Sequence, residues 1–191
     1  MRPLGSLSLS EVQDLCAKAA RGAGLDWGLA EEAGFAARWL YARGLDGPAS
    51  LHNFLEEEGA KNSPLVVGTT IADRAATVST VPVQNPLLML PFLYLASNEL
   101  GRTAQLSWRG FQVLVTPTGM IRGNVRELAS EALADVSIMF GDDQAVPIYK
   151  PTTMDISPTT LSGLTSLAMK TTVPATAASR ADAGAGGGDN D

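Results

Sequence analysis

The first stretch of the chain carries apolar residues at helical spacing. From Leu9 onward they recur every three or four positions until Gly22 and Gly24, a pattern that predicts an amphipathic helix. Ser8 and Glu11 have the spacing of a capping box, in which each side chain bonds the backbone N–H of the other residue. We therefore expect the first helix to begin at Ser8.

Two more helices are predicted before residue 60. The second follows Asp26, carries Trp27, several alanines and Leu40 on its apolar positions, and ends at Gly44. It is expected to form a helical hairpin with the first. A third, shorter helix begins at residues 46–48 and ends in a run of glutamates, 56–58.

From residue 65 the pattern changes to β-branched residues. Residues 65–71 are rich in Val, Thr and Ile, and residues 77–83 are rich in Val and Thr. We interpret them as two strands joined by a turn at 72–75. Residues 103–108 and 111–116 flank Arg109-Gly110, which is typical of a hairpin. A further turn at Thr118-Gly119 leads into strand 120–122, so we expect a meander.

The remaining sheet region is less uniform. Residues 135–140 alternate between apolar and polar side chains, which predicts a strand ending at Gly141. Residues 125–133 fit both a short helix and an edge strand. Their apolar residues have helical spacing, whereas the neighbouring strands favour a strand, so both alternatives stay open.

One stretch, 85–101, is apolar on every side. Asn85 is expected to cap its first turn, Pro86 suits the first helical position and Gly101 can end the helix in a left-handed conformation. Pro91 lacks an N–H donor, so we expect a kink there or a short turn before a helix that begins at Pro91. The apolar run is shorter than the ~20 residues that a membrane span needs. We interpret it as a buried core helix.

The whole pattern predicts an α+β fold. We expect an N-terminal helical hairpin with a short third helix (8–59), an antiparallel sheet of hairpins packed on the central apolar helix (64–145), and a C-terminal helix (157–170) capped by Ser157 and opened by Pro158. These parts are expected to form a single domain, 1–170. Residues 171–191 form a Gly- and Ala-rich tail, whose composition alone predicts disorder.

Composition narrows the class of protein. The 191 residues include 45% hydrophobic and 18% charged residues, the balance of a globular protein. The net charge is −6, and the Lys and Arg residues are scattered singly, which argues against nucleic-acid binding. No signal peptide is recognisable at the N-terminus, and Cys16 cannot form an internal disulfide. We therefore expect a cytoplasmic protein that does not enter membranes.

Residues for common catalytic and metal chemistry are scarce. His52, the one histidine, lies beside Asn53 and is expected to be a surface or half-buried residue rather than the base of a triad. Cys16 is interpreted as a small core residue. Asp142 and Asp143 follow a glycine, which is more typical of a turn than of a cation site. We expect no metal and no cofactor, and the sequence assigns no catalytic residue.

Two clusters remain as candidate ligand- or partner-binding sites. Glu31, Glu32 and Arg38 lie within two turns of the second helix, with Arg21 near its start. Their carboxylates and guanidinium groups can meet at a pocket edge, or simply complement the helix dipole and pair locally. The second cluster is in the tail, whose glycines permit close backbone approach in a groove. Its candidate residues are Ser179, Arg180, Gly186, Asp189 and Asp191.

The chain also resembles a family of short bacterial proteins known only as a domain of unknown function. At the start of the chain, the resemblance rests on residues 19–24 (AARGAG), 27–34 (WGLAEEAG) and 38–40 (RWL). In the centre and the tail it rests on residues 85–92 (NPLLMLPF), 172–176 (TVPAT), 179–180 (SR), 183–186 (AGAG) and 189–191 (DND). The resemblance implies a bacterial, cytoplasmic origin and a defined tail, but no activity or cofactor.

Two classes of function fit these features. The first is a non-catalytic accessory or oligomeric subunit that docks through its C-terminal tail onto a protein partner or a second copy, with a homo-oligomer expected. The second is a small enzyme or binding protein for a polar or anionic metabolite, which would use Glu31, Glu32 and arginines, since carboxylate bases need no histidine.

Overall fold

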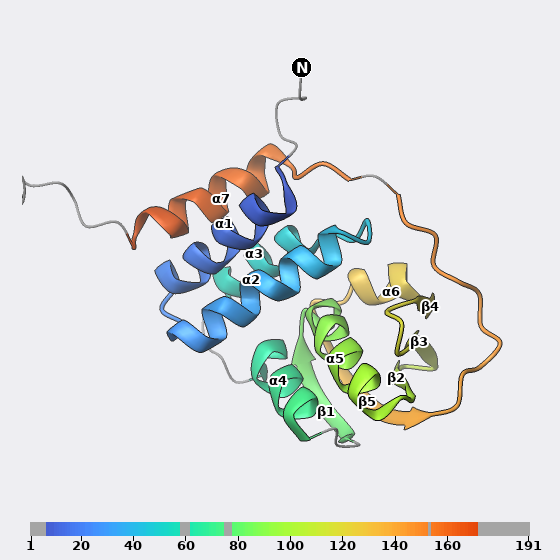
Figure 1. Cartoon of the computed structure of the whole chain (residues 1–191). Coiled ribbons are helices and arrows are strands. Elements are labelled where there is room, and N and C mark those ends of the chain that lie inside the picture. The colour runs from blue at the N-terminus through green and yellow to red at the C-terminus, as the bar shows by residue number, and fades with distance from the viewer. Residues whose placement is uncertain (1–6, 58–61, 75–77, 153, 172–191) are drawn as a thin grey trace, which may run out of the picture.

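A computed structural model describes residues 7–57, 62–74, 78–152 and 154–171. These residues form an α+β structure, as the sequence predicts, in which four N-terminal helices, one more than expected, precede an antiparallel sheet (Figure 1). The helices, in chain order, are α1 (Leu9–Gly22), α2 (Trp27–Tyr41), α3 (Gly47–Glu56), α4 (Pro64–Arg74), the 3₁₀ turn η2 (Pro86–Met89), α5 (Leu90–Leu100), α6 (Val125–Ala129) and α7 (Pro158–Met169).

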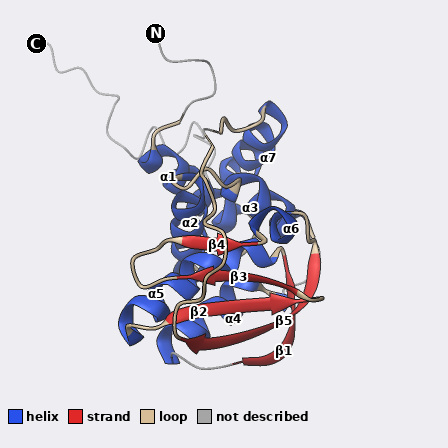
Figure 2. Cartoon of the chain, turned by 90° about the vertical axis from the view of Figure 1, so that its right-hand side faces the viewer, coloured by secondary structure: helices blue, strands red, loops and turns tan. Residues whose placement is uncertain are grey.

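Within the part of the chain that the structure describes, five strands form one sheet with antiparallel pairing throughout. Figure 2 faces this sheet, with α4 and α5 behind it and the segment after the last strand crossing in front. The order of strands across the sheet is β1-β5-β2-β3-β4. Their bounds are β1 (Val78–Gln84), β2 (Thr103–Trp108), β3 (Phe111–Val115), β4 (Ile121–Gly123) and β5 (Leu133–Gly141).

The helix starts follow from local capping. The Ser8 N–H donates to Glu11 Oε2 at 2.7 Å and the Glu11 N–H donates to Ser8 Oγ at 3.2 Å, so the predicted capping box is present. Asp26 accepts from the Leu29 N–H at 2.8 Å at the start of α2. Ser157 accepts from the Thr160 N–H at the start of α7. These short-range bonds explain why these three helices could be predicted.

The predicted strand at 65–71 is wrong, because this segment is the helix α4. Three of its four buried residues, Leu65, Gly68 and Ile71, recur every three positions, and the helix packs against α5. The threonines, which favoured a strand, bond back to the helix: Thr69 Oγ1 donates to the Leu65 carbonyl at 2.9 Å. Packing of one helical face has therefore outweighed β-propensity.

Of the two alternatives predicted for segment 85–101, a kink at Pro91 or a short turn followed by a helix, the structure confirms the second. The short 3₁₀ turn η2 precedes α5, Pro91 lies in the first turn of α5, and Gly101 ends it at φ 63°. Asn85, however, makes no capping bond with its side chain. Its backbone is left-handed at φ 42° and its N–H donates to the Ala132 carbonyl at 2.7 Å.

The sheet is a meander only in part. Strands β2, β3 and β4 follow one another, and Arg109-Gly110 makes the predicted tight turn with positive φ at both residues. Strand β5 then returns to lie between β1 and β2, so the edges of the sheet are β1 and β4. Residues 125–129 form the helix α6, which resolves the open choice between helix and strand.

Helix α7 lies far from the sheet and packs on α1 and α3 (Figure 1). Its fully buried residue is Leu164. Two glycines allow α7 to approach α1 and α3 closely. A Cβ at Gly22 of α1 would overlap the carbonyl of Leu167 in α7, and a Cβ at Gly163 of α7 would overlap the His52 ring in α3. The end of the described chain, Lys170 and Thr171, is thereby brought beside α1 and α2.

No helix among the residues described is long and apolar enough to span a membrane.

Candidate functional site

The candidate site is a groove on the α1–α2 hairpin. The two helices pack closely, since a Cβ at Gly34 would lie 2.7 Å from the carbonyl oxygen of Gln13. On one side of this contact lies a groove of about 950 Å³, whose far walls come from α5 and from the end of α7. Its lining residues are Gln13, Asp14, Ala17, Lys18, Arg21, Gly22, Trp27, Ala30, Glu31, Glu32, Phe35, Leu95, Lys170 and Thr171.

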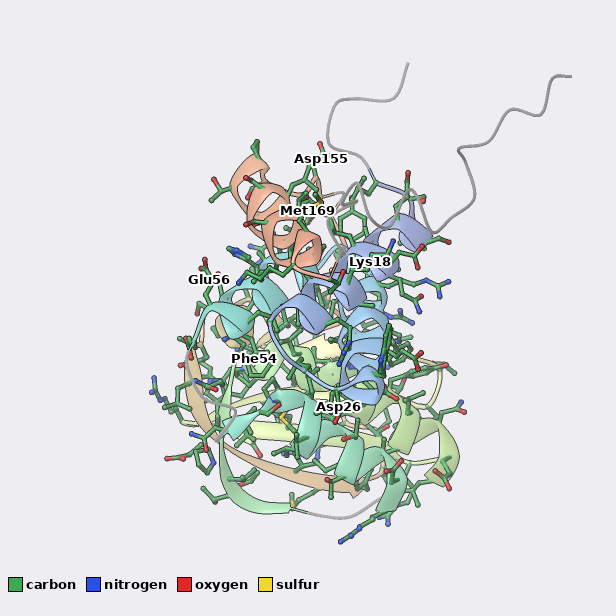
Figure 3. All side chains as sticks on the ribbon, turned by 90° about the vertical axis from the view of Figure 1, so that its left-hand side faces the viewer. Lys18, Asp26, Phe54, Glu56, Asp155 and Met169 are labelled. Carbon is green, nitrogen blue, oxygen red and sulfur yellow. The ribbon has the colours of Figure 1, made fainter. Side chains whose placement is uncertain are left out.

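Figure 3 views the molecule from the side of α1 and α7. Lys18 projects from α1, Asp26 marks the start of α2, and Met169 lies on α7. The groove therefore joins residues from the first helices of the chain with residues 170 and 171 at the end of the described region.

Trp27 supplies the largest exposed apolar surface of the groove. It is the first residue of α2 and its exposed fraction is 72%. The Arg21 guanidinium lies 4.6 Å from the centroid of the ring and donates to the Leu25 carbonyl. This cation–π contact holds the ring in place while leaving most of it in water, an arrangement suited to contact with a ligand or a protein partner.

Six charged side chains surround the groove, three of each sign. Within the residues described, none of the six forms an ion pair, although opposite charges share one groove. Their charges are consequently available to an incoming group of either sign. The cations are Lys18, Arg21 and Lys170, and the carboxylates are Asp14, Glu31 and Glu32.

Glu32 lies where this groove meets a smaller pocket of about 350 Å³ between α2 and α4. Burial raises the pKa of the Glu32 carboxyl above its ordinary value, and the carboxylates of Asp73 and Glu31 raise it further. Asp73 and Thr69 belong to the smaller pocket. Glu32 thus experiences repulsion from α4 as well as from its own helix.

This raised pKa predicts a pH-dependent contribution to stability. The folded state holds the Glu32 proton more tightly than the unfolded chain, so the contribution is complete below the ordinary pKa of 4.5 and is lost as the pH rises through the folded value. Glu32→Gln should therefore gain stability relative to the wild type as the pH increases. Urea denaturation at about pH 4 and about pH 7 measures the difference. Glu127→Gln, on an exposed face of α6, is the control, and an equal trend for both variants would contradict the prediction.

The predicted N-terminal cluster is only partly brought together. Glu31, Glu32 and Arg21 line the groove, whereas Arg38 does not; its Nη1 donates at 3.0 Å to Oε1 of Gln13, which is itself a lining residue. The second predicted cluster lies outside the described residues; it comprises Ser179, Arg180, Gly186, Asp189 and Asp191.

Sequence reasoning misses several residues of the groove. The apolar pattern places Trp27 on the buried face of α2, yet that face is formed without it, by four alanines together with Gly34, Trp39 and Leu40. The sequence does indicate that Trp27 can lie on the surface, because it comes immediately after Asp26, which caps the helix. Lys18 and Lys170 give no local indication, because packing of α7 on α1 brings them together.

The expectation of a surface or half-buried His52 is wrong. His52 is 8% exposed, at the contact of α3 with α7, and its Nε2 lies 3.5 Å from Glu56 Oε1. Gly163 leaves space for the ring. Asp143 pairs with Arg122 at 3.1 Å, and the described part of the chain contains no group of three or more His, Cys, Asp or Glu side chains that could hold a metal.

Cys16 is fully buried in the core, and burial raises the pKa of its thiol to about 12. We predict that a thiol reagent at neutral pH modifies the folded protein only as fast as the protein unfolds. Absorbance of the released thiolate, followed with and without denaturant, measures both rates. Modification of the native protein at the rate of the denatured protein would contradict the burial of Cys16.

Comparison with known proteins supports the expected resemblance over the first part of the chain. Residues 7–83 match the model of a family described as "Protein of unknown function (DUF3726)". The predicted likeness to a family of unknown function is thus confirmed over this range, which contains α1 to α4 and both helices of the groove. The central and tail motifs lie outside the matched range. Searches of curated proteins and of solved structures gave no match.

Proposed function

We propose that this protein is a non-catalytic accessory or oligomeric subunit that docks onto a protein partner, or onto a second copy of itself, through the α1–α2 groove and the C-terminal tail. The observation that carries the proposal is the position of Lys170 and Thr171. Both line the groove, so the tail that follows them starts at the rim of an open apolar and charged surface.

The form of the groove favours a polypeptide as its ligand. Small-molecule sites usually enclose most of the ligand, whereas this groove is open along the helices and presents an exposed aromatic ring. Trp and Arg are enriched where proteins bind one another, and here Trp27 and Arg21 are stacked at the groove. Charges of both signs around them would orient a partner segment.

The residue chemistry supports a non-catalytic role. Among the described residues, the histidine is buried between helices and the thiol of Cys16 has a pKa of about 12, so neither is placed to act as a base or nucleophile in the groove. The net charge of −6 is unsuited to nucleic acid. We further propose a location in the bacterial cytoplasm, away from membranes and without a cofactor.

Three variants test the proposal, with light scattering to measure mass and co-purification to measure retention of a partner. Removal of residues 172–191 and Trp27→Ser should each weaken self-association, or retention of a stoichiometric partner, severalfold. Met139→Ser is the matched control, because Met139 is an apolar side chain of β5 with an exposed fraction of 51% that lies outside the groove. Equal mass and equal partner retention for the full-length, truncated and Trp27→Ser proteins would refute the proposal.

The charges around the groove also favour a second candidate function, the binding of a polar or anionic metabolite. Lys18, Arg21 and Lys170 could contact a carboxylate or phosphate, while Glu31 and Glu32 contact an amine. A rise in melting temperature with small acids or amino acids, abolished by Lys18→Ala but retained after truncation, would support this function over docking.

A further inference from the structure

The tail is long enough to reach every part of the groove from which it starts. Residues 172–191, if extended, span up to roughly 66–72 Å at 3.3–3.6 Å per residue. Helix α1, which forms one wall, is roughly 21 Å long at 1.5 Å per residue. The chain that begins at Thr171 can therefore cross the groove more than once.

The tail also complements the groove in charge and in size. Arg180 is its one cation, and its anions are Asp182, Asp189 and Asp191. Among the described residues, the groove presents carboxylates on α2, at Glu31 and Glu32, and cations that form no ion pair. Most other tail residues are Ala, Gly or Thr, which allow a backbone to lie close to a wall.

We infer that in the free protein residues 172–191 occupy the α1–α2 groove of their own chain, with Arg180 paired to the Glu31–Glu32 wall. Arg180 follows Thr171 by nine positions, a reach of roughly 30 Å, which exceeds the length of α1. The connection through α7 gives the tail a high effective concentration at this groove, so its own chain is favoured over a second copy.

This inference rests on the proposed function, because it takes the groove as the docking surface and adds its regulation. A partner has to displace the tail before it can contact Trp27. The tail is then an autoinhibitory segment, and the affinity for a partner is reduced by the fraction of molecules with a filled groove. Truncation removes this competition together with the contacts that the tail itself makes with the partner, and the net weakening expected under the proposed function follows because the second loss is the larger.

Fluorescence quenching of Trp27 tests the inference directly. Trp39 and Trp108 are buried, so a neutral quencher such as acrylamide mainly reports on Trp27. Truncation after Thr171 and Arg180→Glu should each raise the quenching constant by about twofold or more, because covering by the tail removes most collisions with the ring. Arg126→Glu, an exposed charge reversal on α6, is the control and should leave quenching unchanged.

A charge exchange identifies the partner of Arg180. Combining Arg180→Glu with Glu31→Arg should restore the lower quenching constant of the wild type, since the ion pair is reformed with reversed signs. Unchanged melting temperatures of the variants show that quenching reports tail position rather than unfolding. Equal quenching of the full-length and truncated proteins would overturn the inference.

Dependence on protein concentration separates this inference from the proposed function. Protection of Trp27 within one chain stays constant when the concentration is raised about a hundredfold, whereas protection by a second copy increases together with the mass. The second result would overturn docking within one chain and support self-association. Protection without any partner or self-association would instead refute the proposed function and leave this inference standing.

Discussion

Replacing Phe92 with alanine should lower the free energy of unfolding by about 3–5 kcal/mol, the largest effect we expect for any single substitution. Phe92 is fully buried in α5 and lies against both the helical hairpin and α4. Its ring is 6.2 Å from that of Phe35 in an edge-on geometry. Loss of the ring removes these contacts and leaves a cavity between three helices that the backbone cannot close. Urea denaturation measures the loss.

Phe111→Ala provides a matched control, because Phe111 is a partly exposed phenylalanine at the β2–β3 turn. It should cost about 1 kcal/mol or less through its contact with the Trp108 ring. Equal losses for the two variants would mean that α5 is not the centre of the core.

The contact between Phe92 and Gly68 adds a test of coupling. A Cβ at Gly68 would lie 2.8 Å from Cγ of Phe92, so Gly68→Ala alone should destabilise the protein by about 1–3 kcal/mol. In a Phe92→Ala background the methyl group added at Gly68 has space to fill. The double variant should therefore lose less stability than the sum of the losses of the two single variants. Simple additivity would show that α4 and α5 do not meet at this point.

The elements that could be predicted are those fixed by neighbouring residues. Ser8, Asp26 and Ser157 each bond a backbone N–H three residues away, and Arg109-Gly110 supplies the two positive φ values of a tight hairpin. Such bonds depend on a few adjacent positions, and those positions are visible in the sequence.

The errors concern features set by contacts between distant segments. The residues of α4 favour a strand by propensity, and it is packing of their buried face against α5, including the fit of Gly68 against Phe92, that explains their helical form. Strand β5 enters between β1 and β2, an arrangement that nearest-neighbour order along the chain does not indicate. His52 is covered by α7, more than a hundred positions later in the chain.

The candidate site divides in the same way. Glu31 and Glu32 are predicted from their clustering on one helix, and both line the groove. Lys170 and Thr171 reach that groove because α7 packs on α1, a contact between the first helix and the last. The groove is therefore a product of tertiary packing. Glu31 and Glu32 are the part of it that could be predicted from neighbouring residues in the sequence.

That packing makes Gly22 the residue on which the groove most depends. Gly22→Ala would place its Cβ 2.7 Å from the carbonyl carbon of Leu167 and in overlap with the carbonyl oxygen. Since these are backbone atoms, no side-chain rotation relieves the clash, and α7 has to move away from α1. Alanine ordinarily stabilises a helix by about 1 kcal/mol relative to glycine. Here partial loss of burial around Leu164 should outweigh that gain, for a net loss of about 1–3 kcal/mol in urea denaturation.

The control is Gly28→Ala in the first turn of α2. Gly28 is exposed, and a Cβ at this position would have its nearest neighbouring atom 3.6 Å away, so the substitution should be neutral or stabilising within about 1 kcal/mol. Gly22→Ala should also raise the sensitivity of Trp27 to acrylamide, because movement of α7 carries Lys170 and the start of the tail away from the groove. If Gly22→Ala proves as stable as Gly28→Ala, α7 does not pack on α1 at this glycine, and the groove loses the wall from which the tail begins.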